Sequence, residues 1–125
     1  MTGKTVAVIG ASADRAKFGN KAVRAFRDAG WTVFPIHPTL AQVEGLPAFR
    51  SLDAVPITAL DQVTFYVPPH IGVGLLEQVQ RKNPRDVWLN PGSESPEILA
   101  RAQELGLNVV QACSILGVGR HPGSY

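Results

Sequence analysis

The sequence predicts an α/β protein with a doubly wound, five-stranded parallel sheet in a three-layer α/β/α arrangement. Short apolar runs alternate along the chain with segments of helical pattern, which is typical of a sheet covered by helices on both faces. The 125 residues fit one domain, and 45% apolar with 18% charged residues is typical of a folded globular chain. Neither a repeat nor a linker divides the chain, so we expect a single domain over residues 1–125.

The first strand is expected at Thr5–Ile9, an apolar run rich in β-branched residues that ends at Gly10. Apolar residues then recur at helical spacing over Asn20–Ala29, and Gly30 ends that helix. The second strand follows at once, at Thr32–Ile36. This opening predicts a strand, a loop, a helix and a parallel strand.

The middle of the chain, residues 37–61, has no clear period. Its glycine and proline residues predict turns, and Ser51–Ala54 predicts a single helical turn. The third strand is expected at Gln62–Val67, because Pro68 and Pro69 stop it. We therefore expect a long connection between the second and third strands.

In the second half, a helix is predicted over His70–Arg81 and the fourth strand over Asp86–Leu89. Another helix is predicted over Pro96–Leu105. Ser95 is a natural N-cap before a proline at the first helical position, and Gly106 closes the segment.

The fifth strand is expected at Asn108–Gln111. The tail from Gly117 onward is rich in glycine, so we expect no regular element there. Five strands joined by right-handed crossovers give an open doubly wound sheet, in which ligands lie beyond the carboxyl ends of the strands.

Composition and charge exclude several classes of protein. The single cysteine excludes an internal disulfide and a cysteine-based metal site, and we expect no metal. No signal-peptide pattern opens the chain and no apolar run reaches about 18 residues, so we expect a cytoplasmic protein without a membrane segment. Six of the basic residues lie within residues 1–30, but no aromatic residues alternate with them, which argues against nucleic-acid binding.

The loop after the first strand predicts a phosphate site. Backbone N–H groups and the dipole of the following helix favour an anion there, and Ser12 and Lys17 add a hydroxyl and a charge. The loop departs from the dinucleotide fingerprint, because Ser12 and Arg15 replace the second and third glycines and Gly19 comes late. The alternative is a turn that needs Gly10 only for its backbone freedom.

The end of the second strand helps to choose the nucleotide. Proteins that bind NAD usually have an acid there for the ribose hydroxyls, but this chain has His37-Pro38. An acid at this position would repel a ligand that carries a phosphate on that ribose, and this chain has none there. Coenzyme A, with its 3′-phosphate, therefore fits better than NAD, and NADP fits by the same reasoning.

Two further loops are expected to line the ligand cleft. Val67-Pro68-Pro69 forms a rigid apolar ledge against which an adenine ring or a pantetheine arm can lie, or simply a strand stop and helix entry. Asn90-Pro91-Gly92 is a turn by composition, with amides that can face the cleft.

Residues for catalysis are few, so an enzyme is the less favoured interpretation. The three histidines are dispersed in the sequence, and no acid has a defined position beside them. Cys113 follows the fifth strand and can form a mixed disulfide with a thiol ligand, although a free cysteine is more often a small buried apolar residue.

The loops together resemble those of the small stand-alone CoA-binding proteins, whose Rossmann-like fold is similar to the CoA-binding domain of the succinyl-CoA synthetase alpha subunit. The matching motifs are Val8-Ile9-Gly10-Ala11-Ser12, Gly30 to Pro38, Gly45 to Leu52, Val67-Pro68-Pro69, Val87 to Gly92 and Ala112-Cys113. Thr39 stands where relatives often have a basic residue. The residues expected to hold CoA are Gly10, Ala11, Ser12, Lys17, Gly19, Asn20, His37, Pro38, Val67, Pro68, Pro69, Ile71, Asn90, Pro91 and Gly92.

Three hypotheses follow. The first is a module that binds CoA or an acyl-CoA without catalysis, with a regulatory role as one option. The second is an NAD(P)-dependent oxidoreductase or redox-sensing domain, which the missing acid after Ile36 disfavours. The third is a structural interaction subunit whose cleft is empty.

Overall fold

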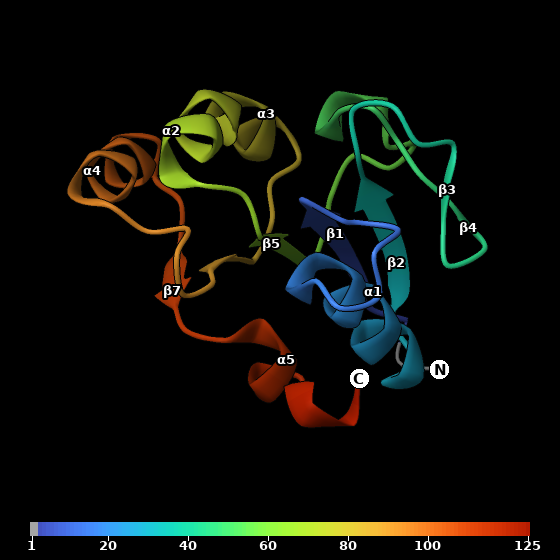
Figure 1. Cartoon of the computed structure of the whole chain (residues 1–125). Helices are drawn as coiled ribbons and strands as arrows, with labels where there is room; N and C mark the ends of the chain where they lie inside the picture. Colours follow the sequence, from blue (N-terminus) through green and yellow to red (C-terminus); the bar gives the residue numbers. More distant parts are fainter. Residues whose placement is uncertain (1–2) are drawn as a thin grey trace.

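A computed structural model describes residues 3–125 and confirms the open, all-parallel, five-stranded sheet (Figure 1). In the centre of β1, Ala7 pairs with Phe34 of β2 and with Val63 of β5. The strand order therefore reverses between β1 and β5, which opens a crevice at their carboxyl ends. In spatial order the strands are β2 (Thr32–Ile36), β1 (Thr5–Ile9), β5 (Gln62–Phe65), β6 (Asp86–Leu89) and β7 (Val109–Gln111).

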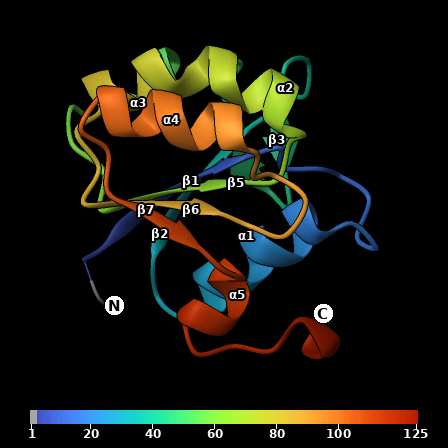
Figure 2. The ribbon, with the colours of Figure 1, turned by 90° about the vertical axis from the view of Figure 1, so that its left-hand side faces the viewer.

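Helices cover both faces of the sheet (Figure 2). Along β1, Val6 and Val8 pack in the core on the side of α1, whereas Ala7 and Ile9 pack in the core on the opposite side. This alternation is the period of an extended strand, and both faces are buried. One layer holds α1 (Phe18–Asp28) and α5 (Ser114–Gly117), and the other holds α2 (Pro69–Gly72), α3 (Leu76–Arg81) and α4 (Pro96–Glu104).

Glycine residues end the two longest helices as predicted. Gly30 has φ +89°, and the next N–H, that of Trp31, donates to Phe26 O at 3.1 Å, which closes α1. Gly106, with φ +72°, closes α4 in the same way. At the start of α4, Ser95 Oγ accepts the N–H of Ile98 at 3.2 Å, which confirms the predicted N-cap.

The connection from β2 to β5 contains a hairpin that was not predicted, formed by β3 (Gln42–Val43) and β4 (Leu46–Pro47). Its turn residues, Glu44 and Gly45, both have positive φ, which suits the right-handed twist of a two-residue hairpin. The expected helical turn is present as the 3₁₀ segment η1 (Leu52–Ala54).

Two further predictions are corrected. The third strand ends at Phe65 rather than at Val67, because its neighbour β1 turns away at Gly10, with φ +92°. The helix expected over 70–81 begins at Pro69 and contains a 3₁₀ segment, η2 (Val73–Leu75). Glycines in this stretch weaken its α-helical preference.

The tail from Gly117 was expected to be irregular, but it contains the 3₁₀ turn η3 (Pro122–Ser124) after the short helix α5. Gly117 lies directly against the Trp88 ring, where any larger residue would overlap. The Tyr125 hydroxyl donates to Asp28 Oδ2 at 2.8 Å, so the tail is held on α1. Long-range contacts, which the local sequence does not reveal, order this segment.

Candidate functional site

Three hollows adjoin one another along the carboxyl edge of the sheet, around the crevice between β1 and β5. The central hollow has a volume of about 500 Å³ and is lined by the loops after β1, β5 and β6. It shares Gly10 and Val67 with an apolar hollow of about 280 Å³, which lies between the carboxyl ends of β1 and β2 and the segment from α2 to α3. On its other side it shares Phe18, Tyr66 and Pro91 with a hollow of about 120 Å³ that reaches Cys113. Together they form one elongated groove, which we call the edge groove.

Glycine is required at two places where the first turn meets α1. A side-chain carbon on Gly10 would lie 2.8 Å from the carbonyl oxygen of Tyr66, and the positive φ would strain it further. A side-chain carbon on Gly19 would collide with the carbonyl oxygen of Gly10. These two glycines let the start of α1 pack directly on the turn, so that its N-terminus opens into the edge groove.

The N-terminus of α1 presents free N–H groups to the edge groove. Lys17 is the N-cap in extended conformation, and no side chain caps the helix. Within residues 3–125, no acceptor pairs with the N–H groups of Phe18 and Gly19, and both residues line the central hollow beside Lys17. Free donors, a helix dipole and a lysine together favour an anion.

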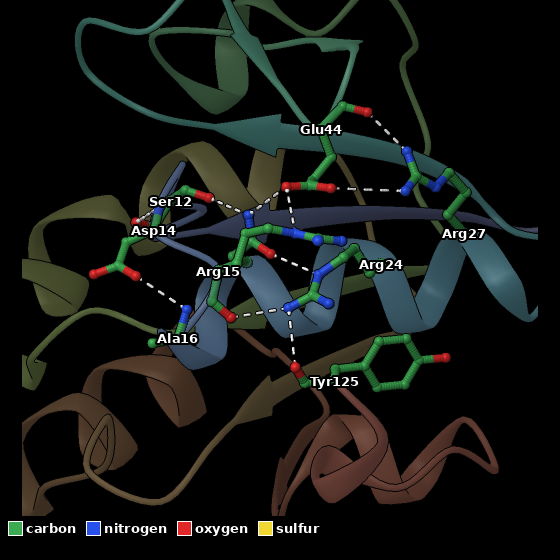
Figure 3. A network of polar contacts seen from close by, with 9 residues as sticks. Ser12, Asp14, Arg15, Ala16, Arg24, Arg27, Glu44 and Tyr125 are labelled. Carbon is green, nitrogen blue, oxygen red and sulfur yellow. Dashed lines mark hydrogen bonds and ion pairs between the residues drawn. The ribbon is translucent and has the colours of Figure 1, made fainter.

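A polar network with buried Asn20 and Arg24 at its centre holds the loop before α1 in place (Figure 3). Asn20 is fully buried and donates through Nδ2 to the Ser12 carbonyl at 2.8 Å and to Glu44 Oε2 at 3.0 Å. Ser12 Oγ accepts the N–H of Asp14 at 3.0 Å, and Asp14 Oδ1 accepts that of Ala16 at 3.0 Å. Ser12, Asp14 and Ala16 are therefore tied to one another, and the Ser12 carbonyl is tied to the helix behind the loop.

The same network extends to the hairpin and to the tail. Buried Arg24 donates through Nε to Asn20 Oδ1 at 2.7 Å and through Nη2 to the Arg15 carbonyl at 2.9 Å, and its guanidinium lies 5.5 Å from the Tyr125 ring (Figure 3). On the hairpin, the hydrogen bond from Asn20 and the nearby arginines hold the pKa of Glu44 below its ordinary value. The loop before α1 thus has support from two segments distant in the sequence.

Three polar residues, Arg50, Ser51 and Gln78, are among those that line the apolar hollow. Its surface is formed mainly by aliphatic and proline residues, among them Ile36, Pro38 and Val67. Arg50 lines it and forms no salt bridge with any residue that the structure describes. A bridge between Ile36 and Phe49 holds the Arg50 segment beside the end of β2. This end of the edge groove suits a flat apolar group that carries negative charge.

At the opposite end, a buried chain of hydroxyl groups lies behind the small hollow. Tyr66 Oη is 2.9 Å from Ser114 Oγ, which accepts the Thr64 hydroxyl at 2.8 Å. Asn90 Nδ2 donates to Thr64 Oγ1 at 2.7 Å, and its Oδ1 accepts the Ser114 N–H at 2.8 Å. Burial raises the pKa of Tyr66 to about 12, so the phenol is protonated at neutral pH. Cys113 is half-buried, packs against the core on the side of α1 and lines the small hollow.

The structure brings most of the predicted residues together in the edge groove. Asn90 contributes to its wall although its amide is fully hydrogen-bonded within the protein. The residues that line the edge groove are Gly10, Lys17, Gly19, Pro38, Val67, Pro68, Ile71, Asn90, Pro91 and Gly92.

Five predicted residues lie beside or beneath the edge groove rather than in its lining. Ala11 and Asn20 are buried, and the Ser12 hydroxyl accepts a local N–H group. His37 Nδ1 accepts the N–H groups of the two residues that follow Pro38, and Pro69 begins α2. Their positions assign them to the support of the loops, and contact with a ligand stays a prediction.

The sequence interpretation missed several lining residues. Tyr66 follows β5 directly, and a third strand drawn two residues too long concealed it. Phe18 was missed because α1 begins two residues earlier than expected. Arg50 lies in the Gly45 to Leu52 motif that resembles the family, but that motif was not assigned to the ligand. Gln78 reaches the edge groove from a segment that carries no motif, so no local signal identifies it.

Three further observations concern metal sites, membrane-spanning helices and a hollow outside the edge groove. Across residues 3–125, no cluster of three histidine, cysteine, aspartate or glutamate side chains is arranged to hold a metal ion. No helix in that part of the chain combines the length and the apolar character needed to cross a membrane. A separate hollow of about 330 Å³ lies at the outer edge of β2, beneath the hairpin, and shares no lining residue with the edge groove.

A protein-family model described as a CoA binding domain matches residues 4–119. The acetate–CoA ligase (ADP-forming) I of Archaeoglobus fulgidus is 31% identical over 80 residues. That match covers 64% of this chain but only 12% of the ligase, so the chain corresponds to a small part of that protein.

Solved structures resemble the chain over most of its length. A conserved hypothetical protein from Pyrococcus furiosus has a TM-score of 0.82 at 28% identity, covering 91% of this chain and 98% of its own. A protein from Thermus thermophilus has a TM-score of 0.81 at 30% identity, with 91% and 87% covered. A dinucleotide-forming acetyl-coenzyme A synthetase 1 from Ca. Korarchaeum cryptofilum, in complex with phosphate and ADP, has a TM-score of 0.75 at 25% identity, covering 87% of this chain and 25% of that one.

Proposed function

The chain belongs to the CoA-binding domain family, and we propose that it binds coenzyme A or an acyl-CoA along the edge groove without catalysing a reaction. The observation that carries the proposal is the arrangement of the groove itself. An apolar hollow, a central hollow beside the uncapped N-terminus of α1, and a small hollow adjoin one another in that order. CoA has an adenosine, a diphosphate and a pantetheine arm in the same order.

In this proposal the diphosphate lies at the centre, against Gly10 and the first turn of α1. The free N–H groups of Phe18 and Gly19 donate to its oxygens, and Lys17 adds a positive charge. The close approach requires a backbone without a side chain at Gly10, which the positive φ there also favours.

The adenosine lies in the apolar hollow, against Pro38, Val67 and Ile71. Arg50 places a guanidinium at this end, where CoA has its 3′-phosphate. Thr39 leaves the neighbouring loop position without charge, and Arg50 supplies a cation from another segment. Among the described residues that line this hollow, none is a carboxylate that would accept hydrogen bonds from the free ribose hydroxyls of a nucleotide such as NAD.

The pantetheine arm then runs past Pro91 and Tyr66 toward Cys113. Two features support binding without catalysis. In the part of the chain that the structure describes, no hydrogen bond joins Cys113 to a histidine or a carboxylate that would act as its base. Tyr66, with its pKa raised to about 12, stays protonated and is a hydrogen-bond donor rather than a base.

Calorimetric titration with CoA, NADH and NADPH tests this function. We expect binding heat with CoA, and weaker or no binding with NADH. Heat from NADH or NADPH alone would support an oxidoreductase or redox sensor, and no heat from all three would support an interaction subunit. Either result would overturn the proposal.

The role of Arg50 is tested by comparing CoA with 3′-dephospho-CoA in the wild type and in Arg50→Ala. Loss of one charge-assisted contact should weaken CoA by about 10-fold to 100-fold and leave dephospho-CoA nearly unchanged. Arg81→Ala is a matched control, because Arg81 is exposed, pairs with Asp53 and lies outside the edge groove. An equal loss for both ligands would show that Arg50 does not contact the 3′-phosphate.

A further inference from the structure

The buried chain of hydroxyl groups behind the small hollow has a definite order of protons, which can be followed from Asn90. The Oδ1 atom of Asn90 accepts the backbone N–H of Ser114 at 2.8 Å, and its Nδ2 atom donates to the backbone carbonyl of Phe65 at 2.8 Å. These backbone groups fix the orientation of the amide, so Nδ2 is also the donor to Thr64 Oγ1 at 2.7 Å. Thr64 Oγ1 in turn donates its own proton to Ser114 Oγ at 2.8 Å.

The last hydrogen bond of the chain joins Ser114 Oγ and Tyr66 Oη at 2.9 Å, and either atom can be the donor. If Tyr66 donated, the proton of Ser114 would have no acceptor among the described residues, in a residue that is only 1% exposed. A buried donor without an acceptor destabilises the fold, so Ser114 is the favoured donor. The proton that is left over then belongs to Tyr66, which is less deeply buried and lines both the central and the small hollow.

The Tyr66 hydroxyl therefore differs from that of Tyr125. Tyr125 Oη donates to Asp28 Oδ2 at 2.8 Å and accepts Arg120 Nε at 2.9 Å, so both of its hydrogen-bonding roles are filled within the protein. Tyr66 Oη accepts from Ser114, but residues 3–125 offer no acceptor for its proton. Burial raises the pKa of Tyr66 to about 12, so the phenol keeps this proton at neutral pH.

We propose that the Tyr66 hydroxyl donates to an amide carbonyl of the pantetheine arm and thereby favours CoA over nucleotides that lack this arm. The inference rests on the proposed function, which runs the arm past Pro91 and Tyr66. Amide carbonyls lose water when they enter a narrow hollow, and a donor on its wall compensates for that loss.

The other side chains that line the small hollow are poorer donors. The Asn90 amide is fully hydrogen-bonded within the protein, and Phe18 and Pro91 have apolar side chains. The Cys113 thiol is a weak donor. Tyr66 is therefore the side chain of this lining that is best suited to donate to a carbonyl of the arm.

The test compares CoA with adenosine 3′-phosphate 5′-diphosphate, the same nucleotide without the arm. The wild type, Tyr66→Phe and Tyr125→Phe are titrated with both ligands by calorimetry. Phenylalanine keeps the ring and removes only the hydroxyl, and Tyr125→Phe is the matched control because Tyr125 lies outside the edge groove. Tyr66→Phe also leaves the Ser114 proton without an acceptor, but that change is present with either ligand.

We expect Tyr66→Phe to bind CoA roughly 3-fold to 10-fold more weakly than the wild type and to bind the armless nucleotide equally well. Tyr125→Phe should match the wild type with both ligands. An unchanged affinity of Tyr66→Phe for CoA, or an equal loss for both ligands, would overturn the inference and leave CoA binding intact. A wild type that does not bind CoA would overturn the proposed function, and this inference with it.

A second readout reports the hydrogen bond itself, also if the armless nucleotide binds too weakly for calorimetry. Infrared difference spectra are recorded for bound CoA that carries ¹³C at its amide carbonyls. Because a hydrogen bond lowers the stretching frequency of a carbonyl, one amide band should lie at lower frequency in the wild type and in Tyr125→Phe than in Tyr66→Phe. A purely structural role of Tyr66 would not move this band, so the same band position in all three proteins would overturn the inference.

Discussion

Asn20→Ala is expected to destabilise the protein far more than the same substitution at an exposed asparagine. The side chain donates to the Ser12 carbonyl at 2.8 Å and to Glu44 Oε2 at 3.0 Å, and it accepts from Arg24 Nε at 2.7 Å. Two of these hydrogen bonds involve a charged group, and each such bond contributes roughly 1.5–3 kcal/mol. Alanine would also leave the buried guanidinium of Arg24 without one acceptor. We therefore expect the free energy of unfolding to fall by about 3 kcal/mol.

In a domain of this size, that loss corresponds to a thermal midpoint lower by roughly 10 °C. Circular dichroism during heating, together with urea unfolding, measures both quantities. Asn108→Ala is the matched control, because Asn108 also donates two hydrogen bonds but lies exposed at the surface. It should cost less than about 1 kcal/mol. If Asn20→Ala shifted the midpoint no more than Asn108→Ala, the network would not be the support that its geometry indicates.

Three further predictions concern single side chains. Lys17→Ala should weaken CoA binding by ~1–3 kcal/mol in calorimetry, whereas Arg85→Ala, which removes the same charge beside the start of β6, should leave it unchanged. When the protein is titrated with base and followed by ultraviolet absorbance, Tyr66→Phe should lack the phenol that has a pKa of about 12. Because that pKa lies above the ordinary value of 10.0, the contribution of the Tyr66 phenol to stability is present below pH 10 and is lost as the pH rises toward 12. The pKa of Glu44 is lowered, and the largest cause is the hydrogen bond from Asn20. The contribution of Glu44 to stability is therefore present above the ordinary pKa of 4.5 and is lost as the pH falls below it. The wild type should therefore exceed Glu44→Gln in thermal midpoint at pH 7, with the difference shrinking toward pH 3; a constant difference would contradict this assignment.

Strong local patterns explain why the sheet was predicted well. The β-branched runs at Thr5–Ile9 and Thr32–Ile36 and the apolar run at Asp86–Leu89 begin and end where the structure has them. Glycines with positive φ close α1 and α4 at Gly30 and Gly106, as their positions in the sequence indicated. The family resemblance carried by the loops is also confirmed by the match over residues 4–119.

Features that depend on distant contacts were not predictable. The hairpin has strands of two residues, too short for a detectable period, and its turn at Glu44 and Gly45 lacks the common Asn-Gly or Asp-Gly signal. The turn η3 forms in a glycine-rich tail, and Tyr125 is held on α1 by Asp28. In each case tertiary packing outweighs a weak local preference.

The same distinction applies to the edge groove. The loop before α1 and the Val67-Pro68-Pro69 segment were predicted to line a ligand site because they follow strands, where ligands of such sheets lie. Gln78 is one polar position on a surface helix, and only its depth and its unpartnered oxygen distinguish it from Gln80. That information arises from packing and is absent from the order of residues.

The most direct measurement of the central claim is an NMR titration of the ¹⁵N-labelled protein with CoA. If CoA lies along the carboxyl edge of the sheet, the largest amide shifts should fall at Gly10, Phe18, Gly19 and Val67, which surround the central hollow. Little change is expected in the separate hollow at the outer edge of β2, around Thr32–Phe34. Shifts confined to that outer edge, or no shifts at saturating CoA, would contradict the account.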